Sequence, residues 1–284
     1  MPAIPFAFRP EKKIDREFVR VLQRMAIHAR SLTKRSQGKL SGPTHQARVL
    51  IKRLRALLWF AKPTFSSLEL TRSKSQLRKA SRLLAPQRDL AVLQLTLKKL
   101  SRDTASREDR KILARISFFH PTNSRYDEKS MQSLQQAIAL LLGTIAQIER
   151  SAESRSKWPS LSKRPAKAFH AMKKAEKKAL RSGEAIQFHN WRKKTKRLLY
   201  QLQLTESAPN HHMRRIIKQT DKLQAKLGDY HDSTVVQDHL RKNPPEKMPR
   251  ALVIHCVKLL EKRKKRLQQK AKKMARRIQP KLAP

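Results

Sequence analysis

A ten-residue pattern occurs twice in the chain, 144 positions apart, and constrains the fold more than any other feature. The copies read His45-x-x-Arg48-x-x-x-Lys52-Arg53-Leu54 and His189-x-x-Arg192-x-x-x-Lys196-Arg197-Leu198. Both lie in segments whose apolar residues recur with helical spacing. The repeat therefore predicts two equivalent halves, each with one helix that presents a histidine and several fixed cations.

The net charge restricts what the protein binds. The 284 residues include 67 Lys and Arg against 21 Asp and Glu, a formal net charge of +46. Self-repulsion on this scale destabilises a compact state, and a polyanionic partner would relieve it. Nucleic acid, inorganic polyphosphate and an anionic membrane all qualify, and the charge alone does not choose among them. Aromatic residues, at 5%, are sparse for base stacking.

The periodicity predicts an all-α protein. Only five glycines are present, strong helix formers dominate, and no stretch of useful length alternates as a strand does. Helices are expected over residues 9–35, 44–61, 67–84, from 88, 107–117, 127–155, 167–181, 184–205, 209–227, 232–241 and 249–278. Asp89 and Asp232 lie where helix N-caps are expected. We expect two equivalent helical halves, residues 1–158 and 159–284.

Several other classes of protein are disfavoured. The one cysteine, Cys256, excludes an intramolecular disulfide and a cysteine-cluster metal site. The most apolar run, Ala137 to Ala146, is shorter than the about 20 residues that a membrane-spanning helix needs. Residues 1–13 lack the apolar core of a secretory signal. We expect a cytoplasmic protein with no metal or cofactor and no membrane insertion, and the sequence leaves its oligomeric state open.

Helical geometry places the repeated cations on one side of each helix. With about 100° per residue and His45 at zero, Arg48, Lys52 and Arg55 fall within about 80° of it. The apolar residues of this segment fall on the opposite side, between about 120° and 240°. The segment is therefore expected to separate a buried face from a cationic ridge about 15 Å long.

The second copy repeats this arrangement with one cation fewer. His189, Arg192 and Lys196 take the same angles as their counterparts, and Lys193 lies beside them. Leu199 occupies the position of the fourth cation in the first ridge. We therefore expect the second ridge to be shorter.

Further cations extend the ridges onto neighbouring helices, where basic residues recur at similar steps of three and four. If paired helices turn these rows toward one another, they form a groove that can neutralise successive phosphates of a linear polyanion. The alternative is a solvated basic face that keeps the protein in solution. The additional candidate ligands are Arg20, Arg24, His28, Arg72, Lys79, Arg82, Arg88, Arg197, Lys218, Lys222 and Lys226.

The repeated motif, with two others, resembles the conserved histidine α-helical domain family, CHAD. The other matching pieces are Arg88-Asp89-x-x-Val92 and Leu227-Gly228-Asp229-x-His231-Asp232-x-x-Val235-Val236. The resemblance covers the chain from about Ile14 to the last helix. It implies two pseudo-symmetric helical bundles around a basic surface or central pore, and an association with inorganic polyphosphate and polyphosphate granules. By position, the implied ligand residues are His45, Arg48, Lys52, Arg55, His189, Arg192, Lys193 and Lys196.

We therefore predict a non-enzymatic polyphosphate-binding protein. The alternative is a nucleic-acid-binding or compacting protein, which the net charge alone supports. An enzyme acting on phosphates is disfavoured because the sequence holds no P-loop, no His-Glu-x-x-His motif and no evident carboxylate cluster for Mg²⁺. His45 and His189 would be the only candidates to attack a phosphate.

Overall fold

The protein is all-helical in a computed structural model that describes residues 6–9, 11–34, 41–104, 106–118, 128–205, 211–244 and 249–278. Within these ranges there are ten helices and no strand, which confirms the expected fold class. The helices are α1 (Ile14–Lys34), α2 (Ser41–Phe60), α3 (Ser67–Leu83), α4 (Ala85–Asp103), α5 (Arg107–Phe118), α6 (Glu128–Glu153), α7 (Lys163–Ser182), α8 (Ala185–Leu204), α9 (His211–Lys242) and α10 (Arg250–Ala275).

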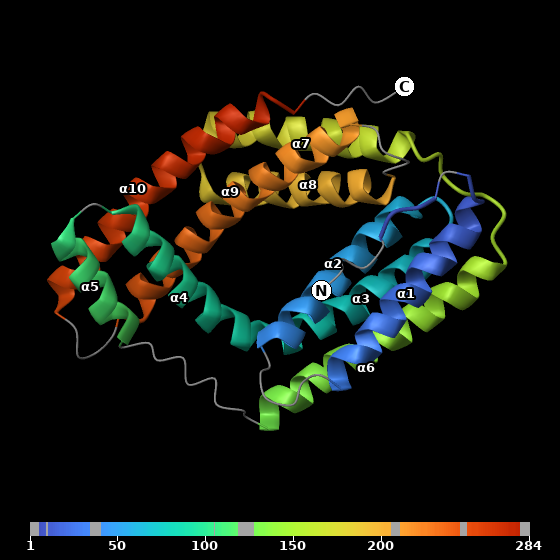
Figure 1. Ribbon diagram of the computed structural model, residues 1–284, viewed down its shortest axis with the longest axis horizontal. Helices are drawn as coiled ribbons and strands as arrows, with labels where there is room; N and C mark the ends of the chain where they lie inside the picture. The colour runs from blue at the N-terminus through green and yellow to red at the C-terminus, as the bar shows by residue number, and fades with distance from the viewer. Residues whose placement is uncertain are drawn as a thin grey trace.

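Two helical bundles form the right-hand and the upper side of an elongated ring (Figure 1). The first consists of α1, α2, α3 and α6, packed around fully buried residues such as Phe18, Leu54 and Leu141. The second consists of α7, α8, α9 and the C-terminal part of α10, packed around Trp191 and Leu223. Each helix contributes an apolar stripe with helical spacing, so burial of these stripes explains the two cores.

A third core closes the ring on the far side of the central opening (Figure 1). Leu97 of α4 and Ile116 of α5 pack there against Leu240 of α9 and Leu260 of α10. This core therefore combines helices from both sides of the expected division at residue 158.

The two bundles also interlock directly where the C-terminal parts of α2 and α8 meet. The Gln201 side-chain amide donates a hydrogen bond to the Ala56 carbonyl oxygen at 2.9 Å. Trp59 lies under two guanidinium groups, Arg164 at 4.2 Å and Arg197 at 5.0 Å from its ring centroid, and its carbonyl oxygen accepts a hydrogen bond from Arg164. Cation–π contacts and a shared hydrogen-bond network thus fix the angle between the bundles.

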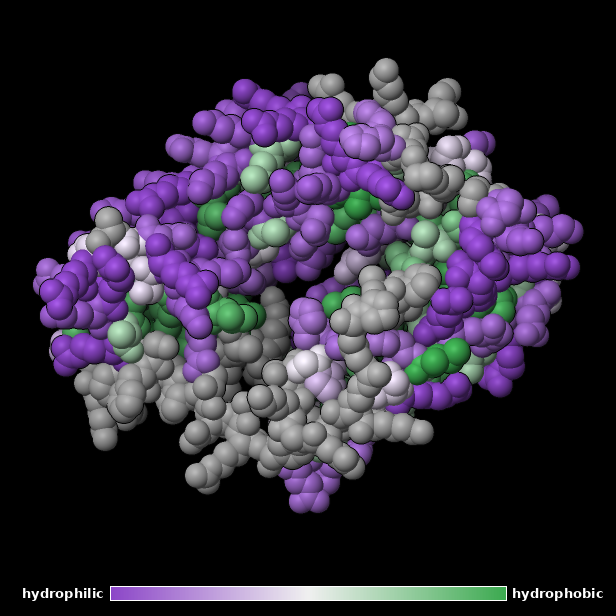
Figure 2. Space-filling view, viewed as in Figure 1, coloured by the Kyte–Doolittle hydropathy of each residue, from purple (hydrophilic) through white to green (hydrophobic). Residues whose placement is uncertain are grey.

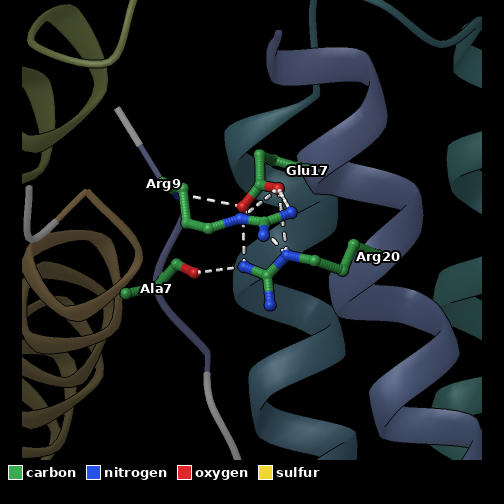
Figure 3. Close-up of polar contacts among 4 residues, drawn as sticks. All are labelled: Ala7, Arg9, Glu17 and Arg20. Carbon is green, nitrogen blue, oxygen red and sulfur yellow. Dashed lines mark hydrogen bonds and ion pairs between the residues drawn. The ribbon is translucent and has the colours of Figure 1, made fainter. Parts of the chain in front are cut away.

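The segment before α1 is held by a buried ion cluster (Figure 3). Glu17 is 1% exposed and accepts hydrogen bonds from the guanidinium groups of Arg9 and Arg20, at 2.6 and 2.7 Å for the shortest contacts. Arg20 also donates to the Ala7 carbonyl oxygen at 2.7 Å. Burial alone would raise the pKa of Glu17, but the hydrogen bonds from the two arginines outweigh it and lower this pKa to about 2.

The helix boundaries differ from expectation in one important place. The two separate helices expected over 209–227 and 232–241 form the single helix α9. Asp232 therefore lies in the interior of α9, and the expectation that it caps a helix is wrong. Asp89 lies inside α4, whose N-cap is Leu84, so its expected capping role is wrong as well. Asp89 lies in the second turn of α4, and Asp232 lies far inside α9.

Candidate anion-binding site

Helices α2 and α8, which carry the two cationic ridges, are neighbours in the structure (Figure 1). The two helices converge at their C-terminal ends and separate toward their N-terminal ends, where His45 and His189 lie. On α2, Ala56 is only about 20° from His45 around the helix axis, so the side that contacts α8 is also the ridge side. We call the space between the two ridges the basic wedge and define it by His45, Arg48, Lys52, His189, Arg192 and Lys196.

The electrostatics of His45 depend on residues from both ridges. Its side chain is exposed, yet the surrounding protein removes part of the ring's hydration, and this is the largest cause of its lowered pKa. Lys52 and Arg48 on the same helix lower the pKa further, and so does Lys196 from α8. A histidine of the first ridge therefore experiences the charge of the second.

Arg48 and Arg192 take equivalent positions in the two halves. Arg48 donates a hydrogen bond from Nη1 to the Leu84 carbonyl oxygen at the end of α3, at 2.8 Å. Nε of Arg192 lies 3.9 Å from the point where a Cβ would stand on Gly228 of α9. Leu84 and Gly228 occupy neighbouring places when the third helices of the two halves are aligned, so each arginine is directed to the same region of its own half.

The fourth ridge position differs between the halves, as the sequence indicates. Arg55 donates from Nη2 to the Leu77 carbonyl oxygen at 2.8 Å and to the Ser81 hydroxyl oxygen at 3.0 Å. Burial and the neighbouring charge of Arg78 lower the pKa of Arg55. Leu199, the counterpart, is 5% exposed. Arg55 therefore ties α2 to α3, and Leu199 packs in the core.

His189 has a partner that the sequence interpretation did not assign to the site. Its Nδ1 lies 3.3 Å from Nδ1 of His231 on α9, and the ring centroids are 4.6 Å apart. A hydrogen bond between these atoms requires one protonated nitrogen and one unprotonated nitrogen. In the sequence, His231 follows Gly228 and Asp229 in the second family motif. The sequence predicts a helix break before Asp232, and such a break would leave His231 away from the second ridge.

The candidate cations on α3 and α9 lie outside the basic wedge. Arg72, Lys79 and Arg82 are exposed, and the first two are on the side of α3 opposite Ser81, which contacts α2. On α9, the side that contacts α8 carries Gly228 and His231. Lys218, Lys222 and Lys226 lie instead on the Asp229 side, where Lys99 of α4 binds Asp229 at 2.6 Å and Lys226 approaches it to 3.8 Å.

The remaining candidates have diverse surroundings. Arg20 is engaged by Glu17, so it anchors the N-terminal segment. His28 hydrogen-bonds the Gln46 side chain at 3.0 Å and so joins α1 to α2, while Arg24 and Lys193 are exposed. Arg197 stacks on Trp59 at the junction of the bundles. Arg88 lies in α4, but its side chain is outside the described part of the structure.

Comparison with known proteins matches the chain to one family. The model of the CHAD domain matches residues 23–241, which is most of the chain. The chain belongs to the CHAD domain family. A search of curated proteins finds no match. The crystal structure of the CHAD domain from the plant Ricinus communis is similar, with a TM-score of 0.74 and 16% sequence identity over 98% of this chain and 97% of that one. At this identity the likeness shows the shared fold.

The CHAD domain is hollowed near its middle, with hydrophilic residues on the side formed by the α7–α10 bundle (Figure 2). Among the residues that the structure describes, no three His, Cys, Asp or Glu side chains are placed to hold a metal ion. In the described ranges, no helix combines the length and apolarity needed to cross a membrane. Fixed cations and histidine N–H groups are thus what the basic wedge offers a ligand, and both suit phosphate oxygens.

Proposed function

We propose that this CHAD domain binds inorganic polyphosphate in the basic wedge without acting on it chemically. The family is associated with polyphosphate binding in general. The observation that carries the proposal for this chain is the coupling of the two ridges, in which Lys196 of α8 contributes to the lowered pKa of His45 on α2. Cations that repel one another across a gap are relieved when a polyanion lies between them.

The shape of the basic wedge supports a linear polyanion over a compact one. Each ridge runs along a helix for about 10–15 Å, which is long enough for several consecutive phosphates to meet successive side chains. Arg48 and Arg192 supply planar guanidinium groups for bidentate contacts, and Lys52 and Lys196 act as point charges. His45 and His189 donate hydrogen bonds through ring N–H groups, more strongly when protonated.

The decisive experiment neutralises one lysine from each ridge. The double variant Lys52→Gln/Lys196→Gln is compared with Arg72→Gln/Lys79→Gln, which removes the same charge from the exposed outer side of α3. Titration with polyphosphate of several lengths should show a loss of roughly tenfold or more for the first variant, since each charge-assisted contact contributes about 1.5–3 kcal/mol. The outer variant should lose less than about threefold because exposed charges act weakly. Equal losses in the two variants would place the binding site elsewhere.

The same proposal predicts where the protein is located in a cell. A protein that holds polyphosphate in the basic wedge should concentrate at polyphosphate granules where these exist. Fluorescent fusions of the wild type and of Lys52→Gln/Lys196→Gln test this directly, because the double variant should remain diffuse. A granule signal that survives the double substitution would mean that recruitment uses another surface.

A further inference from the structure

The outer surface of the second bundle carries a row of cations that the basic wedge does not use. Every exposed residue of α7 from Lys163 to Arg181 is basic. The row runs along one side of a helix for about 27 Å. The acidic residue of α7, Glu176, is 7% exposed and bound to Lys173 at 2.7 Å, so it does not offset the row. The row consists of Lys163, Lys167, His170, Lys174, Lys177, Lys178 and Arg181.

The C-terminal half of α10 carries a second basic row in the same bundle. Ala271 and Ala275 of α10 share a core with Met172 and Ala179 of α7, so the two helices belong to the same bundle. From residue 262 to residue 277, one exposed side chain is a glutamine and all others are basic. The exposed cations here are Lys262, Lys265, Arg266, Lys270, Lys272, Lys273, Arg276 and Arg277. Figure 2 shows hydrophilic residues along the corresponding edge of the molecule.

The outer surface of α6 in the first bundle differs, so exposed charge is not uniform over the protein, although α3 of that bundle carries exposed cations as well. The exposed residues of α6 include two acidic and two basic side chains, and the others are glutamine, alanine or glycine. A need for solubility alone does not explain why α6 is nearly neutral while every exposed position of α7 from Lys163 to Arg181 is basic. The concentration of charge on α7 and α10 therefore indicates a polyanionic partner on that side.

We propose that the outer face of α7 and α10 binds duplex nucleic acid independently of sequence. The row on α7 is straight and rigid, which suits a stiff polyanion with one phosphate charge per about 1.7 Å of axis. Lysines predominate on this face, and they neutralise phosphates as point charges without reading base edges. The exposed part of the face contains no aromatic side chain for stacking, which disfavours single strands.

This face is separate from the basic wedge. Helix α7 packs against α8 through residues on its opposite side, such as Met172, whereas Lys196 of the α8 ridge lies near enough to His45 on α2 to affect it electrostatically. A duplex on the outer face and a thread of phosphates in the wedge would therefore not compete for the same side chains. The inference does not depend on the function proposed for the wedge.

The test removes four lysines from this face of the full-length protein. The variant Lys167→Gln/Lys174→Gln/Lys177→Gln/Lys178→Gln is compared with Arg72→Gln/Lys74→Gln/Lys79→Gln/Arg82→Gln, which removes equal charge from exposed positions of α3. Binding of a 30-base-pair DNA and of the matching RNA duplex is measured by fluorescence anisotropy at several salt concentrations. The α7 variant should lose about tenfold or more in affinity, and its salt slope should fall by about 3 to 4, at roughly 0.9 per phosphate contact.

The α3 variant should retain its affinity for the duplexes within about threefold, since its charges lie on the other bundle. Circular dichroism confirms that both variants are folded. Equal losses in the two variants, or no loss in the α7 variant, would overturn the proposal. So would an α7 variant that keeps duplex binding but no longer binds phosphatidylserine-containing vesicles, because the face would then be a membrane contact. If duplex binding is lost while polyphosphate binding is unchanged, the two surfaces act separately as proposed.

Discussion

The two copies of the repeated motif lie on α2 and α8 and have different surroundings. In the first half, α3 ends at Leu83 and α4 begins at Ala85, with Pro86 in the first turn of α4. In the second half, the corresponding stretch is the uninterrupted helix α9, and Asp229 occupies the place of Pro86. Proline lacks the N–H that would bond to the preceding turn, so one residue accounts for the break. His189 accordingly meets a histidine from a continuous helix, while His45 remains exposed.

The largest loss of stability is expected when the proline of the first half is introduced at the equivalent position of the second half. Asp229→Pro should destabilise the protein by about 3 kcal/mol or more, because it removes a hydrogen bond inside α9 and introduces a steric clash. It should also weaken polyphosphate binding, since Gly228 and His231 flank the substituted position. Urea unfolding measures the first effect and titration the second.

The control for that substitution is Asp229→Ala. It removes the ion pairs with Lys99 and Lys226 but keeps the helix, so it should cost only about 1 kcal/mol or less. Similar losses in the two variants would show that the charge of Asp229, rather than the continuity of α9, distinguishes the halves.

A buried carboxylate in the first helix of each bundle provides the second contrast. Glu17 binds two arginines, whereas Glu176 binds the half-exposed Lys173. The folded-state pKa of Glu17 is about 2 against an ordinary value of 4.5, so its ionisation stabilises the fold above about pH 4.5, and this stability is lost as pH falls toward 2. The shift corresponds to about 3 kcal/mol.

Glu17→Gln should therefore remove about 3 kcal/mol at pH 7 and flatten the stability profile between pH 4.5 and 2. Glu176→Gln should cost about 1 kcal/mol or less. Free energies of unfolding in urea at pH 7, 4.5 and 3 measure both. If the profile of the Glu17→Gln variant kept the acid slope of the wild type, other carboxylates would be responsible for it.

The sequence was sufficient to predict the helical class and the family. Angles about one helix axis follow from spacing alone, so the ridges could be placed before their surroundings were known. The partners of each cation could not be predicted, because they depend on how helices pack. Arg20 shares a helix with Glu17 three residues away, yet its role depends on a segment that folds back to Ala7.

The expected break in α9 had a different cause. Gly228 and Asp229 are residues that often end helices, and tertiary packing of Leu227 and Tyr230 in the second core overrides that local preference. Because α9 is continuous, His231 lies beside His189. A helix break before Asp232 would separate these two residues, so the sequence alone does not predict their contact. The packing of α8 against α9 also decides which side of α9 faces the ridge. That side does not carry Lys218, Lys222 or Lys226.

The two histidines give the third contrast. The pKa of His45 is lowered by lost hydration and by Lys52, Arg48 and Lys196, so the free protein binds its proton weakly. A polyanion in the wedge offsets these cations and raises the pKa, so binding takes up a proton and affinity rises as pH falls. Between pH 7.5 and 5.5 the affinity of the wild type should rise more steeply than that of His45→Gln, by at most about tenfold per pH unit, because one proton taken up on binding contributes at most that factor.

Titration in buffers with different heats of ionisation counts the protons directly. His255→Gln is the control, since this residue lies on α10 with Asp109 as its partner at 2.6 Å, away from the basic wedge. If His45→Gln kept the full pH dependence, the His189 and His231 pair would be its source, and the contrast between the two histidines would be reversed.

The smallest effect is expected at Gly228, where the second half has a helical glycine. A Cβ there would meet Nε of Arg192 at 3.9 Å, which is an ordinary van der Waals distance. Because glycine in a helix interior costs about 0.8–1 kcal/mol relative to alanine, Gly228→Ala should stabilise the protein by somewhat less than that and leave polyphosphate affinity unchanged. Gly228→Leu should instead displace Arg192 and weaken binding. If alanine weakened binding as much as leucine, the position of Arg192 would depend on close approach to the α9 backbone, and the glycine would be part of the site.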